Sequence, residues 1–134
     1  MKYLLDSNTC ISVMRGKKRL LISRFFSHPP GDLGVCSVVV GELYVGAIRS
    51  SSPANERAKV DTFLAPYQSL PFDDAAARKY AEVRADLETR GVVISDLDMM
   101  IAATAQVHGL TVVTHNFKDF SRVPGLALED WERP

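Results

Sequence analysis

Three acidic side chains in this sequence lie where local structure can bring them together. Asp6 follows the apolar run Tyr3–Leu5, Glu42 follows a β-branched run, and Asp98 precedes the apolar, alanine-rich stretch Met99–Ala105. Carboxylates held close together repel one another unless a cation binds between them. Oxygen-only ligand sets favour Mg²⁺, with Mn²⁺ as a substitute, over zinc. Such a cluster suits hydrolysis of a phosphodiester, in which the ion activates water and offsets phosphate charge.

Each acid also has a purely structural explanation, and spacing alone leaves both interpretations open. Asp98 stands three residues after Ser95 and can complete a helix capping box, although that box prefers Glu or Gln. Glu42 can favour a helix N-terminus electrostatically. Asp6 can be an ordinary turn residue that ends a strand, and Asp119 can be a turn or cap residue.

Apolar runs and periodic apolar residues alternate along the chain, which predicts strands alternating with helices. The expected strands cover residues 3–5, 33–37, 68–72, 110–114 and 126–128. The expected helices cover 9–15 (capped by Ser7 or Asn8), 17–27, a segment capped by Ser37, 53–66, 74–90 and 94–105, and residues 115–124 are loop or a short helix. With no repeat or linker, this order predicts one α/β domain over residues 1–134, with a mostly parallel sheet of four to five strands and helices on both faces.

In sheets of this kind, ligands bind outside the carboxyl ends of the strands. Asp6 ends the first expected strand, and Glu42 lies about one helical turn beyond the second. Asn116 and Asp119 follow the fourth strand, and Asp98 opens the helix that leads into it. The topology therefore predicts that oxygen ligands from four elements meet at one edge.

Composition indicates an ordinary globular protein. Of 134 residues, 46% are hydrophobic and 24% charged, and the formal net charge is zero. No apolar run approaches the roughly 20 residues that span a bilayer, and the N-terminus reaches an acid before a signal-peptide core can form. We expect a cytoplasmic protein without membrane contact. Cys10 and Cys36 lie among apolar residues, which predicts buried free thiols.

Basic residues are concentrated near the N-terminus. Residues 1–28 hold six lysines and arginines against one acid. The group Arg15, Lys17, Lys18 and Arg19 is either a phosphate-binding lip or a solvated turn and helix face.

Motifs for several other chemistries are absent. The chain has no Walker-type phosphate loop, no dinucleotide-binding glycine motif and no G-x-S-x-G elbow. Its histidines, His28, His108 and His115, have no metal-ligand spacing.

Six short stretches, in order, resemble the PIN-domain ribonucleases, and within them the VapC toxins of bacterial type II toxin–antitoxin modules. The stretches are Leu4–Asn8, Ser37 through Gly41-Glu42-Leu43, Asp98–Ala103, Val113–Asn116, Phe120–Leu126 and Glu129–Trp131. The resemblance covers nearly the whole chain, so it implies a single PIN-like domain.

The resemblance implies a Mg²⁺-dependent endoribonuclease that cleaves RNA, commonly tRNA or rRNA. It makes Asp6, Glu42 and Asp98 the metal-site acids, and it excludes Asp96, which comes two residues too early. Asn116 or Asp119 takes the fourth place, to position water or a second metal. The supporting polar residues carried over are Asn8, Ser37 and Thr114, and Ser7 keeps a hydroxyl where the family often has Thr.

The resemblance also implies a homodimer and a VapB-type antitoxin whose C-terminal segment packs into a groove near the site. The candidates for the groove are Phe25, Phe26, Leu43, Tyr44 and Val45, although core packing is the better explanation for each of them. The N-terminal basic residues become candidates for RNA contact.

Three alternatives stay open at this level. Asp6-Ser7-Asn8-Thr9 approaches the D-x-D-x-T motif of haloacid-dehalogenase-type phosphatases, but Asn8 stands where that chemistry needs a second acid. A PIN-like module that binds without cleaving is the second alternative. A PIN nuclease of RNA maturation, outside any toxin module, is the third.

Overall fold

The computed structural model describes all residues from Met1 to Pro134 as five strands and seven helices, with one 3₁₀ turn at Pro30–Asp32. The strands are β1 (Tyr3–Leu5), β2 (Leu33–Cys36), β3 (Gln68–Leu70), β4 (Thr111–Val113) and β5 (Leu128–Glu129). The helices are α1 (Ser7–Arg15), α2 (Arg19–Ser27), α3 (Ser37–Arg49), α4 (Pro53–Leu64), α5 (Asp74–Thr89), α6 (Asp96–Val107) and α7 (Phe117–Phe120). The predicted alternation of strands and helices is confirmed.

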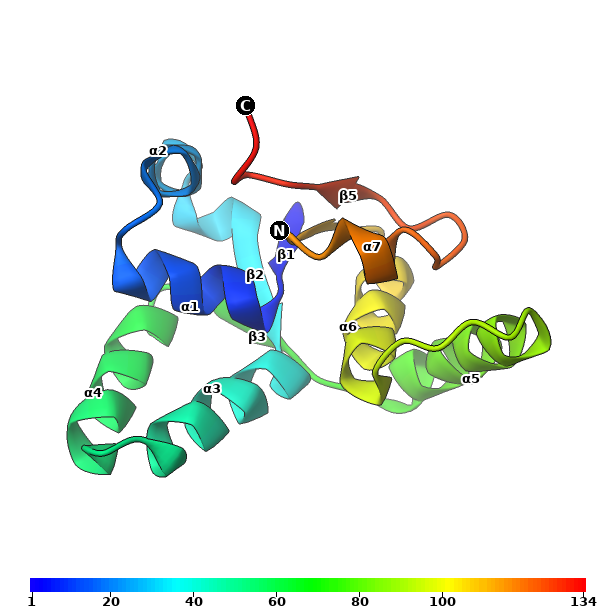
Figure 1. Cartoon of the computed structure of the whole chain (residues 1–134), viewed down its shortest axis with the longest axis horizontal. Coiled ribbons are helices and arrows are strands. Elements are labelled where there is room, and N and C mark those ends of the chain that lie inside the picture. Colours follow the sequence, from blue (N-terminus) through cyan, green and yellow to red (C-terminus); the bar gives the residue numbers. More distant parts are fainter.

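All strand pairs are parallel, and the strand order is β3-β2-β1-β4-β5. The chain steps outward from β1 through β2 to β3, then returns across the sheet to β4 on the other side of β1. Because parallel crossovers are right-handed, this reversal places α1–α4 on one face and α5–α7 on the other. Figure 1 shows these two groups of helices on opposite sides of the strands. The reversal also makes the gap beyond β1 and β4 the topological switch point, where such folds bind ligands.

Several predicted boundaries are wrong by a few residues, each for a local reason. The first helix begins at Ser7 because the Asp6 side chain caps it, accepting a hydrogen bond from the Thr9 backbone N–H, so neither Ser7 nor Asn8 is the cap. Ser37 is likewise the first residue of α3, and Cys36 occupies the cap position without a side-chain bond. The last strand lies at Leu128–Glu129 rather than at 126–128, since these residues pair with Val112 and Val113.

Helix α6 forms one wall of the core. Ala102, Ala103 and Ala105 have no exposed surface, and these small side chains let neighbouring elements approach closely. Cys10 and Cys36 are free and fully buried, and burial raises the pKa of both thiols, as the sequence predicts. None of the seven helices combines the length and the hydropathy that a membrane-spanning helix needs.

Gly34 in β2 is a glycine that the packing requires. A Cβ at this position would overlap the Met1 thioether and lie 3.0 Å from the Gln68 carbonyl oxygen on β3. Gly34→Val is therefore expected to lower the free energy of unfolding by about 1–3 kcal/mol, the usual cost of overpacking a core.

Urea titration followed by circular dichroism measures this cost. Gly31→Ala is the matched control, because nothing lies within 4 Å of a Cβ there. Equal unfolding midpoints for the two variants contradict the requirement for Gly34.

Candidate active site

The switch point places Asp6 at the carboxyl end of β1, beside Thr114 at the carboxyl end of β4. The Asp6 backbone N–H donates to the Val113 carbonyl at 3.2 Å, so the two chain segments stay paired up to the site. Asp6 is only 4% exposed and Thr114 1%. The carboxylate therefore belongs to the floor of the site.

Both Asp6 oxygens are held by hydrogen bonds. Oδ1 accepts from the Thr9 N–H at 2.8 Å, and Oδ2 accepts from the Thr114 hydroxyl at 2.5 Å. Burial raises the pKa of Asp6, and these hydrogen bonds oppose that shift without cancelling it. The same carboxylate thus caps α1 and faces the site, which explains why Asp6 follows the strand directly.

Glu42 reaches the site from the first half of α3. Its Oε1 accepts a hydrogen bond from the Ser7 hydroxyl at 2.6 Å. Ser7 is the residue after Asp6 and opens α1, so this bond ties the position of Glu42 to that of Asp6.

Asp98 approaches from the first turn of α6. The Ser95 hydroxyl caps this helix by accepting the Asp98 backbone N–H at 3.1 Å, so half of the predicted capping box is present. Asp98 is half-buried, and burial raises its pKa to about 6, helped by the nearby charges of Asp6, Glu42 and Asp119 and opposed by the Ser95 side chain. Ser95 therefore fixes the first turn of α6, and the Asp98 side chain that this turn carries lies within electrostatic range of the other three acids.

Asn116 and Asp119 form a pair at the side of the site. The Asn116 amide donates to Asp119 Oδ2 at 3.1 Å, and the Asn116 backbone N–H donates to the Thr114 hydroxyl at 2.9 Å. Since Thr114 in turn donates to Asp6, a chain of hydrogen bonds runs from Asn116 to the buried carboxylate.

The carboxylate oxygens of the site acids are the kind of ligand that a hard divalent cation prefers. Asp6, Glu42, Asp98 and Asp119 offer only oxygen ligands, and none of them forms an ion pair with a basic side chain. Burial raises the pKa of Asp98, and the charges of the other three acids raise it further. No three acidic, histidine or cysteine side chains lie close enough to form a ready-made metal site.

Not all predicted supporting residues lie at the acids. Thr114 does, through its bond to Asp6, whereas Asn8 is exposed and makes no hydrogen bond to the acids. The Ser37 hydroxyl donates to the Leu70 carbonyl at 3.4 Å instead of to an acid. Lys18 forms an ion pair with Glu132, so it is not a free cation for phosphate.

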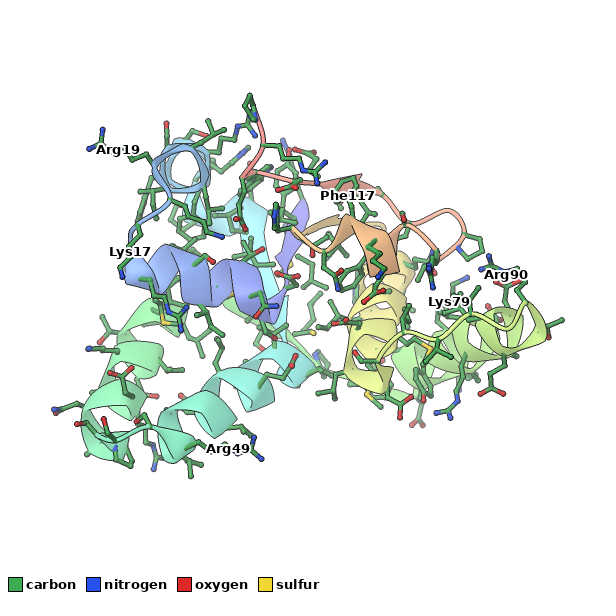
Figure 2. All side chains as sticks on the ribbon, viewed as in Figure 1. Lys17, Arg19, Arg49, Lys79, Arg90 and Phe117 are labelled. Atoms are coloured by element: carbon green, nitrogen blue, oxygen red, sulfur yellow. The ribbon has the colours of Figure 1, made fainter.

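The remaining basic candidates differ in position. Arg15 and Glu42 line the same groove, of about 920 Å³, between α1, α3 and α4. Lys17 and Arg19 lie at the turn between α1 and α2 and point outward (Figure 2).

Of the apolar groove candidates, Phe25 and Leu43 are core residues, while Phe26 and Val45 are exposed.

Sequence reasoning missed three contributors to the site. Thr9 holds Asp6 through its backbone, Ser7 holds Glu42, and the negative charge of Glu132 raises the pKa of Asp6. The only sequence signal was the retained hydroxyl at Ser7. No pattern in the sequence predicts that the C-terminal Glu132 lies near the end of the first strand.

The chain is similar in sequence and in fold to known proteins. Residues 3–126 match the family model described as PIN domain. The chain is 35% identical over 131 residues to the tRNA(fMet)-specific endonuclease VapC of Salmonella typhimurium, with 98% of each chain covered. It is 34% identical over 131 residues to ribonuclease VapC2 of Haemophilus influenzae, again with 98% of each covered.

Solved structures show the same likeness. The structure of DNA-bound VapBC from Salmonella typhimurium superposes with a TM-score of 0.92 at 35% identity, covering 98% of both chains. VapBC2 from Rickettsia felis, bound to a promoter DNA fragment, superposes with a TM-score of 0.89 at 29% identity, covering 98% of this chain and 99% of that one.

The raised pKa of Asp98 predicts a stability cost that depends on pH. Between the ordinary aspartate pKa of 3.8 and the raised pKa of about 6, the folded protein binds more protons than the unfolded chain, so the free energy of unfolding falls as the pH rises through this range. In EDTA at pH 8, Asp98→Asn is therefore expected to unfold at a higher urea concentration than the unmodified protein, and the difference should disappear below pH 4.

Asp96→Asn is the matched control. Asp96 lies in the same first turn, is exposed and pairs with Arg84, so its loss removes a favourable surface contact and should not stabilise the protein. Equal behaviour of the two variants at pH 8 would contradict the electrostatic cost at Asp98.

Proposed function

The chain belongs to the PIN-domain family, and from that premise we propose that it is a metal-dependent endoribonuclease acting as the toxin of a type II toxin–antitoxin pair. The observation that carries this proposal is the match to VapC ribonucleases over almost the full length of both chains. The buried Asp6, with Asp98 within its electrostatic range, is the structural counterpart of that match. Family membership removes the phosphatase alternative.

RNA is the proposed substrate, and its phosphodiester bonds are the bonds hydrolysed. Two relatives are named tRNA(fMet)-specific endonucleases, which makes tRNA the first substrate to test, followed by rRNA. Which bond is cut depends on loop geometry around the site.

Asp6, Glu42 and Asp98 are the residues that would hold a Mg²⁺ or Mn²⁺ ion. Such an ion, when bound, supplies charge neutralisation for the phosphodiester and activation of the attacking water. Thr9 and Thr114 keep both Asp6 oxygens oriented, and Ser7 does the same for Glu42. The Asn116–Asp119 pair stands beside Thr114, where either side chain can position water.

An antitoxin of the VapB type is the proposed partner. The similar structures from Salmonella typhimurium and Rickettsia felis are VapBC complexes, each bound to DNA. The groove of about 920 Å³ between α1, α3 and α4 contains Glu42, so a segment seated there would block the site. The homodimer implied by the family resemblance stays a prediction.

Removal of either central acid tests the catalytic proposal. Asp6→Asn and Asp98→Asn are each expected to lower kcat/KM for RNA at least about 100-fold, because each deletes a charge needed to hold the cation. EDTA should abolish cleavage, and added Mg²⁺ or Mn²⁺ should restore it.

Cleavage of a tRNA and rRNA panel by the purified protein is the measurement, with Asp96→Asn as the active control. Undiminished cleavage by both acid variants would refute the assigned site. A protein that binds RNA but never cleaves it would instead be a binding module.

Expression in a bacterial host tests the toxin role. Expression alone is expected to arrest growth, whereas Asp6→Asn should not, and co-expression of the gene adjacent to the toxin gene should relieve the arrest. Growth is followed by optical density. If the active enzyme is harmless, or no neighbouring gene protects the cells, the protein is a PIN nuclease of RNA maturation instead.

A further inference from the structure

Asp130 is a buried carboxylate that takes no part in the candidate active site. Its side chain is 6% exposed, and it directly follows β5. Oδ1 accepts from the Glu132 backbone N–H at 2.9 Å, and Oδ2 lies 2.9 Å from His115 Nδ1 and 3.2 Å from Arg133 Nε. A carboxylate buried to this degree needs such donors. Asp130 therefore fixes both the C-terminal segment and the His115 ring.

The contact with Asp130 decides which ring nitrogen of His115 carries the hydrogen. An ionised carboxylate only accepts hydrogen bonds, so Nδ1 is the donor and, in the neutral ring, Nε2 is left as an acceptor. Nε2 has no partner in the protein, and because no buried side-chain nitrogen or oxygen lacks a partner, it faces solvent. The His115 side chain is 52% exposed. His115 thus presents an oriented acceptor at the surface.

His115 follows the carboxyl end of β4, between two residues of the candidate site. One neighbour in the chain is Thr114, whose hydroxyl donates to Asp6. The other is Asn116, whose amide donates to Asp119. The imidazole is therefore held at the edge of the sheet where the acids meet, without being a hydrogen-bond partner of any of them.

The basic turn between α1 and α2 is also close to this ring. His115 Nδ1 is 4.0 Å from Glu132 Oε1, and the same carboxylate pairs with Lys18 at that turn. Lys17 and Arg19, on either side of Lys18, form no ion pair and point outward (Figure 2). Because Glu132 joins the ring to the turn, a nucleic-acid strand that runs from the acids to these two cations passes the imidazole.

The group that meets Nε2 must be a hydrogen-bond donor. Phosphate oxygens are acceptors, and the carboxylates of Asp130 and Glu132 beside the ring also disfavour a phosphate. Every ribose of RNA offers a 2′-hydroxyl as a donor, whereas deoxyribose offers none. The chemistry of this position therefore favours the sugar of an RNA strand over its phosphate.

We propose that His115 is a specificity-determining residue: its Nε2 accepts a hydrogen bond from the 2′-hydroxyl of one substrate ribose, and Asp130 is the positioning residue that holds the ring for this contact. The inference rests on the proposed ribonuclease function and adds one contact by which the protein distinguishes RNA from DNA. The contact requires neither a bound cation nor a charged imidazole.

The tautomer of His115 is measured without RNA. Long-range ¹H–¹⁵N NMR correlations of the protein at pH 8 are expected to show a protonated Nδ1 and an unprotonated Nε2. A hydrogen on Nε2 overturns the proposal, because this nitrogen is then a donor.

Two versions of one fluorescent single strand, RNA and 2′-fluoro RNA, test the contact itself. The 2′-fluoro strand keeps the ribose pucker but cannot donate at the 2′ position. Binding is measured by anisotropy in EDTA on two base sequences, and the ratio of the two Kd values cancels the repulsion between the acids and either strand. His115→Asn keeps a donor for Asp130 but lacks the distal acceptor, so the ratio of Kd for 2′-fluoro RNA to Kd for RNA is expected to fall about fivefold, the loss of one hydrogen bond.

His108→Asn is the matched control. His108 is an exposed histidine at the end of α6 opposite to Asp98, and this variant should keep the Kd ratio of the unmodified protein. If His115→Asn fails to fold, as judged by circular dichroism, the Nε2 resonance of the unmodified protein decides. It is expected to shift upfield on addition of RNA and to stay in place on addition of the 2′-fluoro strand.

An unchanged Kd ratio in a folded His115→Asn variant, or an Nε2 resonance that does not respond to RNA, overturns the contact. A loss of affinity that follows the base sequence rather than the 2′-hydroxyl overturns it as well, because Nε2 then accepts from a base. Cleavage with Mg²⁺ separates the two proposals. A protein that shows the contact but never cleaves RNA refutes only the nuclease function, and one that cleaves RNA with an unchanged ratio in His115→Asn refutes only the contact.

Discussion

The site depends on one buried carboxylate that is also a structural group. Asp6 is 4% exposed, yet it has no basic partner, so its charge is compensated by the Thr9 N–H and the Thr114 hydroxyl. These two bonds join α1 and β4 to the end of β1. Because burying a charge without such bonds is costly, the position of the acid and the local fold determine each other.

The other acids are arranged around this fixed point. Glu42 is tied to α1 through Ser7, and Asp98 is carried by the rigid, alanine-rich helix α6. Burial raises the pKa of Asp98, the charges of the neighbouring acids raise it further, and a bound cation or a proton would offset both effects. The folded protein therefore carries unfavourable electrostatic energy at the site, and the proposed cation would reduce it.

Helix α3 divides the surroundings of the site into two spaces. The groove of about 920 Å³ between α1, α3 and α4 has Glu42 in its lining, and so has a smaller hollow of about 590 Å³ between α3 and the first turn of α6. Gly46 lines the groove and Gly41 the hollow, and neither glycine has a packing neighbour that requires it. Glu42 therefore borders two separate spaces.

Much of this could be predicted from the amino-acid order, and the rest could not, for a physical reason. Apolar periodicity depends on neighbours within a few residues, so the alternating strands and helices and the buried α6 followed from the sequence, whereas the exclusion of Asp96 came from the family resemblance. The cap at Asp6 was still missed, because Ser7 and Asn8 were the predicted caps of the first helix. The partners of the acids are different: Ser7 and Glu42 are 35 residues apart, and Asp6 and Thr114 are 108 apart. Such contacts, like the ion pair of Lys18 with Glu132 that removes a predicted phosphate contact, exist only once the sheet order has brought distant segments together.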